Sequence, residues 1–184
     1  MYPTARPFLC TGSPFGCSVF LVGIDPGVGI AFWPHWHPNK GCDKQGWLQS
    51  YLAKHNRYRP TRKRIEILLK MLAPHRVLET NIFPFQREPR TKLISTDTRL
   101  FEFLLQTIQP RLIFVHGQPA VQRLSELLQT RLPRGEFVRV KYQQRIVHVI
   151  AGHHLSGQGQ TAGEAWSDVK VEEFGRRLRN HIAR

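Results

Sequence analysis

The sequence predicts an α/β fold, a three-layer α/β/α sandwich around a central and mostly parallel sheet. Two observations predict it. Short apolar runs alternate along the chain with segments that carry apolar residues at helical spacing. Strands that are separated by helices form parallel sheets, which helices then cover on both faces. The length of 184 residues fits one domain over residues 1–184, since no linker, repeat or low-complexity tract divides the chain.

The first predicted strand runs from Ser18 to Ile24 and is apolar on both faces, which is typical of a buried strand. Asp25 follows it directly, and Pro26 and Gly27 then turn the chain sharply. Taken alone, Asp25 is explained as a cap of this turn. Ligand sites in open α/β sheets form at the carboxyl ends of strands, so the same position also predicts a functional carboxylate.

The later elements follow from periodicity and composition. Apolar residues at helical spacing predict helices over residues 47–55, 59–72, 96–108, 120–132 and 166–183. Apolar runs predict strands over 76–83 and 111–116. Two further runs rich in Val and Ile, 136–144 and 145–151, are expected to pair as a hairpin.

Polar side chains stand at the carboxyl ends of these strands. They are Asp25, Asn81, His116 and the adjacent His153 and His154. Each of them alone is explained as a turn residue or a surface group. Because the carboxyl ends of parallel strands meet at one edge of a sheet, we expect them to form one site of Asp, Asn and His.

The charge of the chain indicates a polyanionic partner. The sequence has 27 Lys and Arg against 13 Asp and Glu, a formal net charge of +14. A solvated surface is the alternative, but the excess is larger than solubility requires, so we expect binding to nucleic acid. Arg62 and Lys63 belong to one of the basic clusters and are expected to contact DNA.

Other classes of protein are not favoured. No apolar run approaches the length of a membrane span, and Met1 to Gly16 lacks the features of a signal peptide, so we expect a cytoplasmic protein with no membrane partner. The three cysteines, Cys10, Cys17 and Cys42, form no paired C-x-x-C arrangement. They predict reduced thiols and neither a disulfide framework nor a zinc site.

Four motifs follow one another from about Ser18 to the end of the chain: Gly23 to Gly27, Phe32-Trp33, Val77 to Asn81, and His154-Leu155-Ser156. In this order they resemble the motifs of the uracil-DNA glycosylase superfamily. Gly23 to Gly27 resembles the water-activating motif of that family, and Phe32-Trp33 lies where the family places an aromatic residue that stacks on the flipped base. Val77 to Asn81 resembles the strand that presents an Asn to the base. His154-Leu155-Ser156 resembles the His-Pro-Ser motif after the last strand.

The resemblance implies a monofunctional glycosylase that excises uracil or another deaminated base from DNA after base flipping, without a cofactor or metal. Asp25 would stabilise the cationic sugar and orient water, His154 would donate a hydrogen bond to the departing base, and Asn81 would recognise the base edge. The remaining expected contacts are with the base for Phe32, Trp33, Gly23 and Ile24, and with DNA for Pro26, Gly27, Leu155 as a wedge, and Ser156. We expect a monomer that binds damaged or deaminated DNA.

Departures from the family pattern limit what the resemblance implies. Leu155 replaces the usual Pro, and the adjacent histidines leave the register open; we choose His154 as catalytic, with His153 as the fallback. The Tyr that helps to exclude thymine is missing after Asp25, and Gly27 resembles the mismatch-specific branch, so the preferred base stays open. Branches that carry an iron–sulfur cluster need four cysteines, so we expect no cluster here.

Two alternatives remain. Gly23 to Gly27 also resembles the first motif of Holliday-junction resolvases, metal-dependent nucleases of the ribonuclease-H-like class, for which Glu79 and Asp168 could supply further carboxylates. The chain is poor in acids, and Pro34 and Pro38 interrupt the second strand that such a fold needs. The other alternative is a DNA-binding protein that keeps the glycosylase fold without its chemistry.

Overall fold

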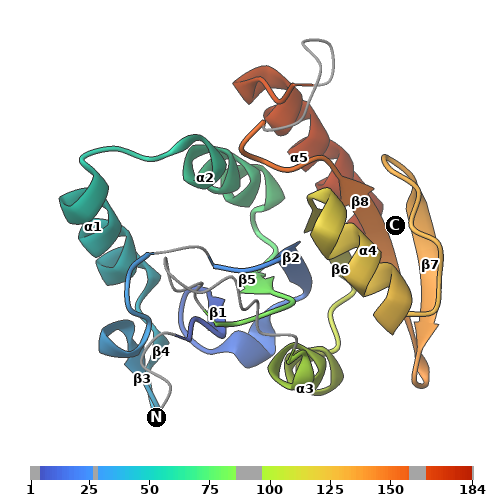
Figure 1. The fold of residues 1–184 in the computed structure, drawn as a ribbon, viewed down its shortest axis with the longest axis horizontal. Coiled ribbons are helices and arrows are strands. Elements are labelled where there is room, and N and C mark those ends of the chain that lie inside the picture. Colours follow the sequence, from blue (N-terminus) through green and yellow to red (C-terminus); the bar gives the residue numbers. More distant parts are fainter. Residues whose placement is uncertain (1–4, 27–28, 86–96, 158–164, 184) are drawn as a thin grey trace.

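The computed structural model describes residues 5–26, 29–85, 97–157 and 165–183. Its main sheet has six strands in the order β1-β5-β2-β6-β8-β7 (Figure 1). The four inner strands run parallel, and the edge strands β1 and β7 pair antiparallel with β5 and β8. The strands are β1 Phe8–Leu9, β2 Val19–Gly23, β5 Val77–Asn81, β6 Leu112–His116, β7 Phe137–Tyr142 and β8 Arg145–Gly152. The predicted α/β class with a mostly parallel sheet is confirmed.

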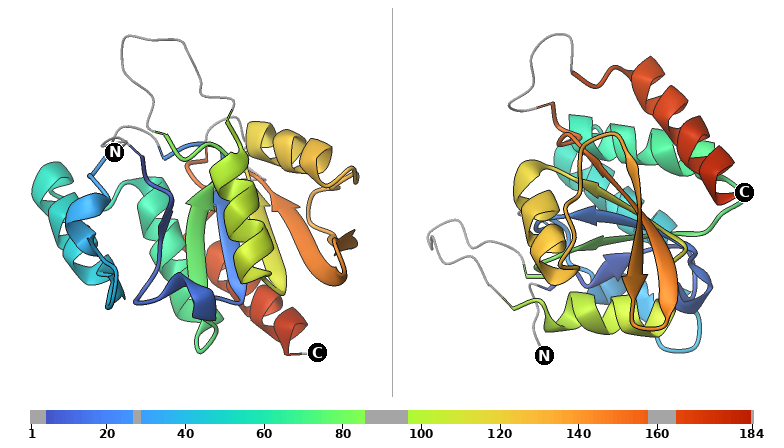
Figure 2. Two further views of the ribbon diagram at one scale, coloured as in Figure 1. Left: turned by 90° about the horizontal axis from the view of Figure 1, so that it is seen from below. Right: turned by 90° about the vertical axis from the view of Figure 1, so that its right-hand side faces the viewer.

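Helices lie on both faces of this sheet, an arrangement compatible with a three-layer α/β/α sandwich (Figure 2). The helices α2 and α5 pack side by side on one face, and α3 and α4 pack on the other. No helix in the described part of the chain is long and apolar enough to cross a membrane. The helices are α1 Lys44–His55, α2 Pro60–Leu72, α3 Arg99–Ile108, α4 Gln118–Leu127 and α5 Asp168–Ile182.

The strand β2 explains why the first apolar run lacks alternation. Its side chains point to opposite faces of the sheet in turn. Val19 and Leu21 enter the core under α2 and α5, whereas Phe20 and Val22 enter the core under α3 and α4. All four are buried, so β2 is covered on both faces, as a central parallel strand must be.

The N-terminal third contains elements that the sequence did not predict. These are the two-residue strand β1 and a small separate sheet of β3, Trp36–His37, and β4, Gly41–Cys42. Strands of two residues are too short to show an apolar period, which is why they were missed. The helix α1 also begins three residues before the predicted start at Trp47, because the side chain of Asp43 accepts a hydrogen bond from the Gly46 amide at 2.9 Å and caps it.

The parallel register brings the predicted site residues to one edge of the sheet. Gly23 of β2 lies opposite Asn81 of β5, and His116 of β6 lies opposite Gly152 of β8. Each of these residues is the last of its strand. Asp25 and His154 follow two residues beyond β2 and β8, so both enter the space above the same edge.

Candidate active site

A cavity of about 520 Å³ opens at the carboxyl ends of the inner strands. Asp25, Asn81, His116 and His154 all line it, as do the predicted residues Gly23, Ile24 and Pro26. His153 is not among the described residues that line it, and its backbone carbonyl accepts a hydrogen bond from the Trp166 indole at 3.2 Å. The structure therefore brings the proposed Asp, Asn and His together, and of the two adjacent histidines it is His154 that lines the cavity.

Gly23 makes close packing at the bottom of this cavity feasible. A Cβ atom at this position would lie 2.9 Å from the Asn81 Oδ1 and 3.5 Å from the His116 Nε2. The first distance is shorter than carbon and oxygen tolerate without displacement. The absence of a side chain at residue 23 thus lets the Asn81 amide and the His116 ring lie over the strand.

Asn81 presents a buried hydrogen-bond donor. The residue is 4% exposed, and its Nδ2 atom has no hydrogen-bond partner in the described ranges of the chain. Buried polar atoms are nearly always hydrogen-bonded, and one that is not costs free energy unless a ligand or water completes it. An amide donor in a cavity wall is therefore a suitable contact for a ligand oxygen.

His154 is held in one tautomer by its own loop. Its Nδ1 atom accepts a hydrogen bond from the Ser156 amide at 3.1 Å, and the Ser156 Oγ lies 2.6 Å from the same nitrogen. Burial lowers the pKa of His154 below its ordinary value, and the nearby Asp25 carboxylate only partly offsets this effect. The ring is therefore neutral at pH 7 and carries its proton on Nε2, where it can donate to a ligand.

His116 lies beside His154, with ring centroids 5.3 Å apart. It is 6% exposed, and burial, followed by the proximity of His154, lowers its pKa to about 3. A second histidine in the site is therefore neutral throughout the physiological range of pH. Its Nδ1 atom is buried and, among the described residues, has no hydrogen-bond partner, which makes the ring a further candidate ligand contact.

A buried ion network reaches the cavity through Glu79 and Arg62, which line it. Glu79 Oε1 lies 2.7 Å from the Lys44 Nζ, and its Oε2 lies 2.7 Å from an Arg62 Nη. Glu66 joins both cations, at 3.3 Å from Lys44 and 2.8 Å from Arg62. Burial alone would raise the pKa of Glu79, but Arg62, Lys44 and Arg6 outweigh it and lower the pKa to about 2.

This network corrects two expectations. Arg62 has a side chain only 5% exposed and bound to two carboxylates, so it is not presented to a DNA phosphate. Glu79 is surrounded by cations, so it is not a candidate metal ligand. The other carboxylate of the nuclease alternative, Asp168, instead pairs with Lys63 at 2.5 Å. In the part of the chain that the structure describes, no group of three His, Cys, Asp or Glu side chains could hold a metal ion.

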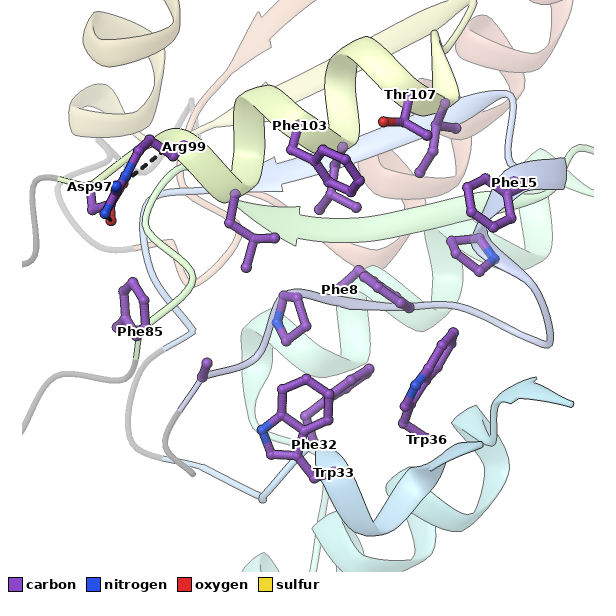
Figure 3. A pocket seen from close by; sticks show the side chains of 16 residues that line it. Phe8, Phe15, Phe32, Trp33, Trp36, Phe85, Asp97, Arg99, Phe103 and Thr107 are labelled. Atoms are coloured by element: carbon purple, nitrogen blue, oxygen red, sulfur yellow. Dashed lines mark hydrogen bonds and ion pairs between the residues drawn. The ribbon is translucent and has the colours of Figure 1, made fainter. Parts of the chain in front are cut away.

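Phe32 and Trp33 lie elsewhere. They line a second, largely apolar cavity of about 680 Å³ between the N-terminal segment and α3 (Figure 3). Phe32 is 1% exposed, with its ring centroid 5.1 Å from that of Phe8 and 6.0 Å from that of Trp36. Contacts with these aromatic neighbours hold it in the core, which removes it from the cavity of Asp25. The expectation that Phe32 or Trp33 stacks on a base in this site is corrected accordingly.

The loop after β8 also differs from expectation in part. Leu155 is fully buried with α2 and α5, and its carbonyl accepts a hydrogen bond from Arg64, so it is not placed as a wedge for DNA. The amide of Ser156 donates a hydrogen bond to the His154 ring, as described above. Lys63 is exposed and forms an ion pair with Asp168. Gly27 lies outside the described residues.

Arg6, Trp47 and Tyr51 are among the cavity residues that the sequence did not point to. Arg6 precedes β1, and Trp47 and Tyr51 come from α1. The Trp47 and Tyr51 rings lie 5.5 Å apart, and the Arg6 guanidinium lies 5.4 Å from the Trp47 ring centroid. Trp47 and Tyr51 stand one helical turn apart, so their shared face could have been predicted from spacing. Nothing local marks Arg6, because the pairing of β1 with β5 is what brings it here.

The Cys10, Cys17 and Cys42 thiols are buried and form no disulfide.

The candidate site combines a carboxylate, an amide donor and a neutral imidazole donor at one cavity, next to a buried ion network. Such a set can hold a polar ring and stabilise charge of either sign at its edge.

No model of a known protein family matches this chain, and no curated protein sequence matches it either.

Proposed function

We propose that this protein is a DNA glycosylase, which hydrolyses the N-glycosidic bond of uracil or another deaminated base in DNA. The observation that most supports the proposal is the convergence of Asp25, Asn81 and His154 on one cavity of about 520 Å³. Cavities of this volume enclose small ligands. A base inside a duplex is not accessible to these groups, so the nucleotide must be flipped out of the stack to reach them.

Asn81 would recognise the base. Uracil has a carbonyl acceptor next to a ring N–H donor, and an amide side chain offers the complementary donor and acceptor, whereas a carboxylate offers acceptors only. Cytosine would present the opposite pattern to the same amide orientation. The Nδ2 donor of Asn81 has no hydrogen-bond partner among the described residues, and this supports the role, because binding a carbonyl oxygen would satisfy it.

His154 and Asp25 would act on opposite sides of the breaking bond. The electron pair of the C1′–N bond leaves with the base, which becomes anionic, while the sugar becomes cationic. The His154 Nε2–H donates to the base oxygen that gains charge or, in hypoxanthine, to the ring nitrogen that gains it. Asp25 stabilises the cationic sugar and orients a water molecule, whose oxygen bonds to C1′ and whose proton balances the charge of the released base.

The rest of the molecule suits a DNA substrate. A net charge of +14 favours contacts with phosphates, and these contacts help to offset the few kcal/mol that flipping costs. Trp47 and Tyr51 form an aromatic wall in the same cavity as Asp25. Tyr51, which is half-buried, would supply the stacking surface for the base that was expected from Phe32 or Trp33, with the buried Trp47 packed against it.

The proposal is tested by base release from oligonucleotides that carry uracil, hypoxanthine or xanthine, in single strands and duplexes, with EDTA throughout. We expect alkali-labile abasic sites, which the Asp25→Asn variant forms far more slowly. Strand cleavage that needs added Mg²⁺ would instead support the nuclease. Tight DNA binding without base release or cleavage would support a non-catalytic protein, and either result overturns the proposal.

A further inference from the structure

Arg6 is a cation in the wall of the candidate site that has no counter-ion contact in the described part of the chain. Its side chain lines the cavity and lies against the face of Trp47, and it forms no hydrogen bond or ion pair with any described residue. Arg62 lies 5.0 Å from the centroid of the same ring, but Arg62 is bound by Glu66 and Glu79. The Arg6 side chain is half-buried, and guanidinium donors in a cavity wall that no described residue binds can be used by a ligand, so Arg6 is a candidate ligand contact.

The charges around Arg6 favour a neutral acceptor over a phosphate. Arg6, Arg59 and Arg62 supply three positive charges to the lining of the cavity, and Asp25 and Glu79 supply two negative ones. Asp25 and Glu79 are the carboxylates close enough to Arg6 to act on its charge, so a phosphodiester bound to Arg6 would bring a negative charge close to both of them. The carbonyl oxygens and ring nitrogens of a base accept hydrogen bonds from an arginine without adding charge.

The order of the side chains along the sheet edge matches the order of atoms around a deaminated purine. Arg6 lies on the β1 side of β5, where its amide donates to the Pro84 carbonyl, and Asn81 ends β5. His154 lies at the far end, beyond β6. Asn81 therefore stands between Arg6 and His154. In a deaminated purine, the O6 and N1–H pair stands between the N7 side and the C2–N3 side.

We propose that Arg6 is a specificity-determining residue that donates to N7 and O6 of a flipped, deaminated purine, such as hypoxanthine or xanthine, while Asn81 binds O6 and N1–H. This inference rests on the proposed function, in that a flipped base occupies the cavity. Paired contacts from arginine to O6 and N7 are the commonest specific contact that proteins make with a purine. Uracil has a C–H group where the purine has N7, so it leaves part of the guanidinium unpaired.

The test measures affinity, so that it does not depend on turnover. In an Asp25→Asn background, single-stranded oligonucleotides with one deoxyinosine, one 7-deaza-deoxyinosine or one deoxyuridine are bound at equilibrium. We expect deoxyinosine to bind about 10- to 100-fold more tightly than its 7-deaza analogue, the range for loss of a hydrogen bond to a charged donor. Adding Arg6→Ala or Arg6→Gln should reduce this difference to less than about 3-fold, and Arg6→Lys should retain part of it.

Arg59→Ala is the matched control, because Arg59 also lines the cavity but is exposed, and it should keep the 7-deaza difference. The inference is overturned if the protein with Arg6 intact does not distinguish the two inosines, or if Arg6→Ala distinguishes them equally well. If Arg6→Ala weakens the binding of all three oligonucleotides equally and makes the affinity less dependent on salt, Arg6 contacts a phosphate, and the inference is also overturned. If the protein distinguishes the two inosines through Arg6 but the wild type releases no base, only the proposed hydrolysis is overturned. If the wild type releases the base but does not distinguish the two inosines through Arg6, only this inference is overturned.

Discussion

The amide of Ser156 donates a hydrogen bond to the Nδ1 atom of His154 at 3.1 Å. An amide N–H can only donate, so this nitrogen must accept and cannot carry the proton of the neutral ring. Because the pKa of His154 is lowered by burial, the neutral ring prevails at pH 7 and its proton is on Nε2. The loop sequence His-Leu-Ser therefore determines which ring atom can donate into the cavity.

The first prediction concerns this donor. His154→Ala should reduce the rate of base release by about 10²- to 10³-fold, the usual loss when one donor to a developing anion is removed. His153→Ala should change the rate little, because the His153 side chain is not among the described groups that line the cavity. Single-turnover rates on one uracil- or hypoxanthine-containing strand measure both. A larger loss of rate for His153→Ala than for His154→Ala would show that His153 is the catalytic histidine.

The second prediction concerns Asp25. Asp25→Asn should slow base release by about 10²- to 10⁴-fold, the range for removal of a group that assists the attacking nucleophile. The affinity for DNA with the target base should stay within about 3-fold of that of the wild type, because the amide keeps the size of the carboxylate. Turnover and equilibrium binding are measured on the same oligonucleotide. Unchanged turnover would remove Asp25 from the mechanism.

Much of the fold could be predicted from sequence, because the inner strands and the helices are long enough to show a period. The convergence of Asp25, Asn81 and His154 could also be predicted, since the ends of parallel strands meet at one edge. The position of Arg6 in the cavity could not be predicted, because it depends on a two-residue strand and on pairing across some 70 residues of chain. The position of Phe32 was predicted wrongly for a related reason, since the sequence does not show which of two neighbouring cavities an aromatic side chain enters.

The third prediction separates a core role from a wedge role for Leu155. The residue is fully buried with Leu68 and Val171. Leu155→Ala should therefore lower the free energy of unfolding by about 2–5 kcal/mol, as large-to-small substitutions in a core do. Urea denaturation measures this loss, and fluorescence anisotropy measures affinity for undamaged duplex DNA, which should not change. If Leu155→Ala greatly lowers the affinity for DNA while the free energy of unfolding is unchanged, Leu155 acts as a wedge in DNA and not as a core residue.

The fourth prediction concerns the buried ion network. Glu79→Gln should destabilise the protein by about 3–5 kcal/mol, because it removes the more buried of the two carboxylates that Arg62 and Lys44 share and leaves them only Glu66. Asp168→Asn is a suitable control, since its pair with the exposed Lys63 should contribute no more than about 1 kcal/mol. Denaturant midpoints at pH 7 compare the two. Equal and small effects would mean that the network does not stabilise the fold.

The last prediction follows from His116, whose pKa is lowered from 6.5 to about 3 by burial and by the neighbouring His154. Between these two values the unfolded chain binds a proton that the folded protein does not, so the free energy of unfolding must fall as the pH is lowered. The slope contributed by one such group approaches about 1.4 kcal/mol per pH unit. The contribution is absent above pH 6.5, where both states are neutral at this residue.

His116→Gln should therefore flatten the stability curve between pH 6.5 and pH 4.5, even if it lowers stability at pH 7. Below pH 4.5 a further loss should remain in the variant, because Glu79, whose pKa is lowered from 4.5 to about 2, is ionised in the folded state while it protonates in the unfolded one. Urea denaturation at half-unit steps of pH measures both windows, with His153→Gln as the control from outside the cavity. If His116→Gln keeps the wild-type slope above pH 4.5, His116 is not the buried neutral histidine that governs acid stability.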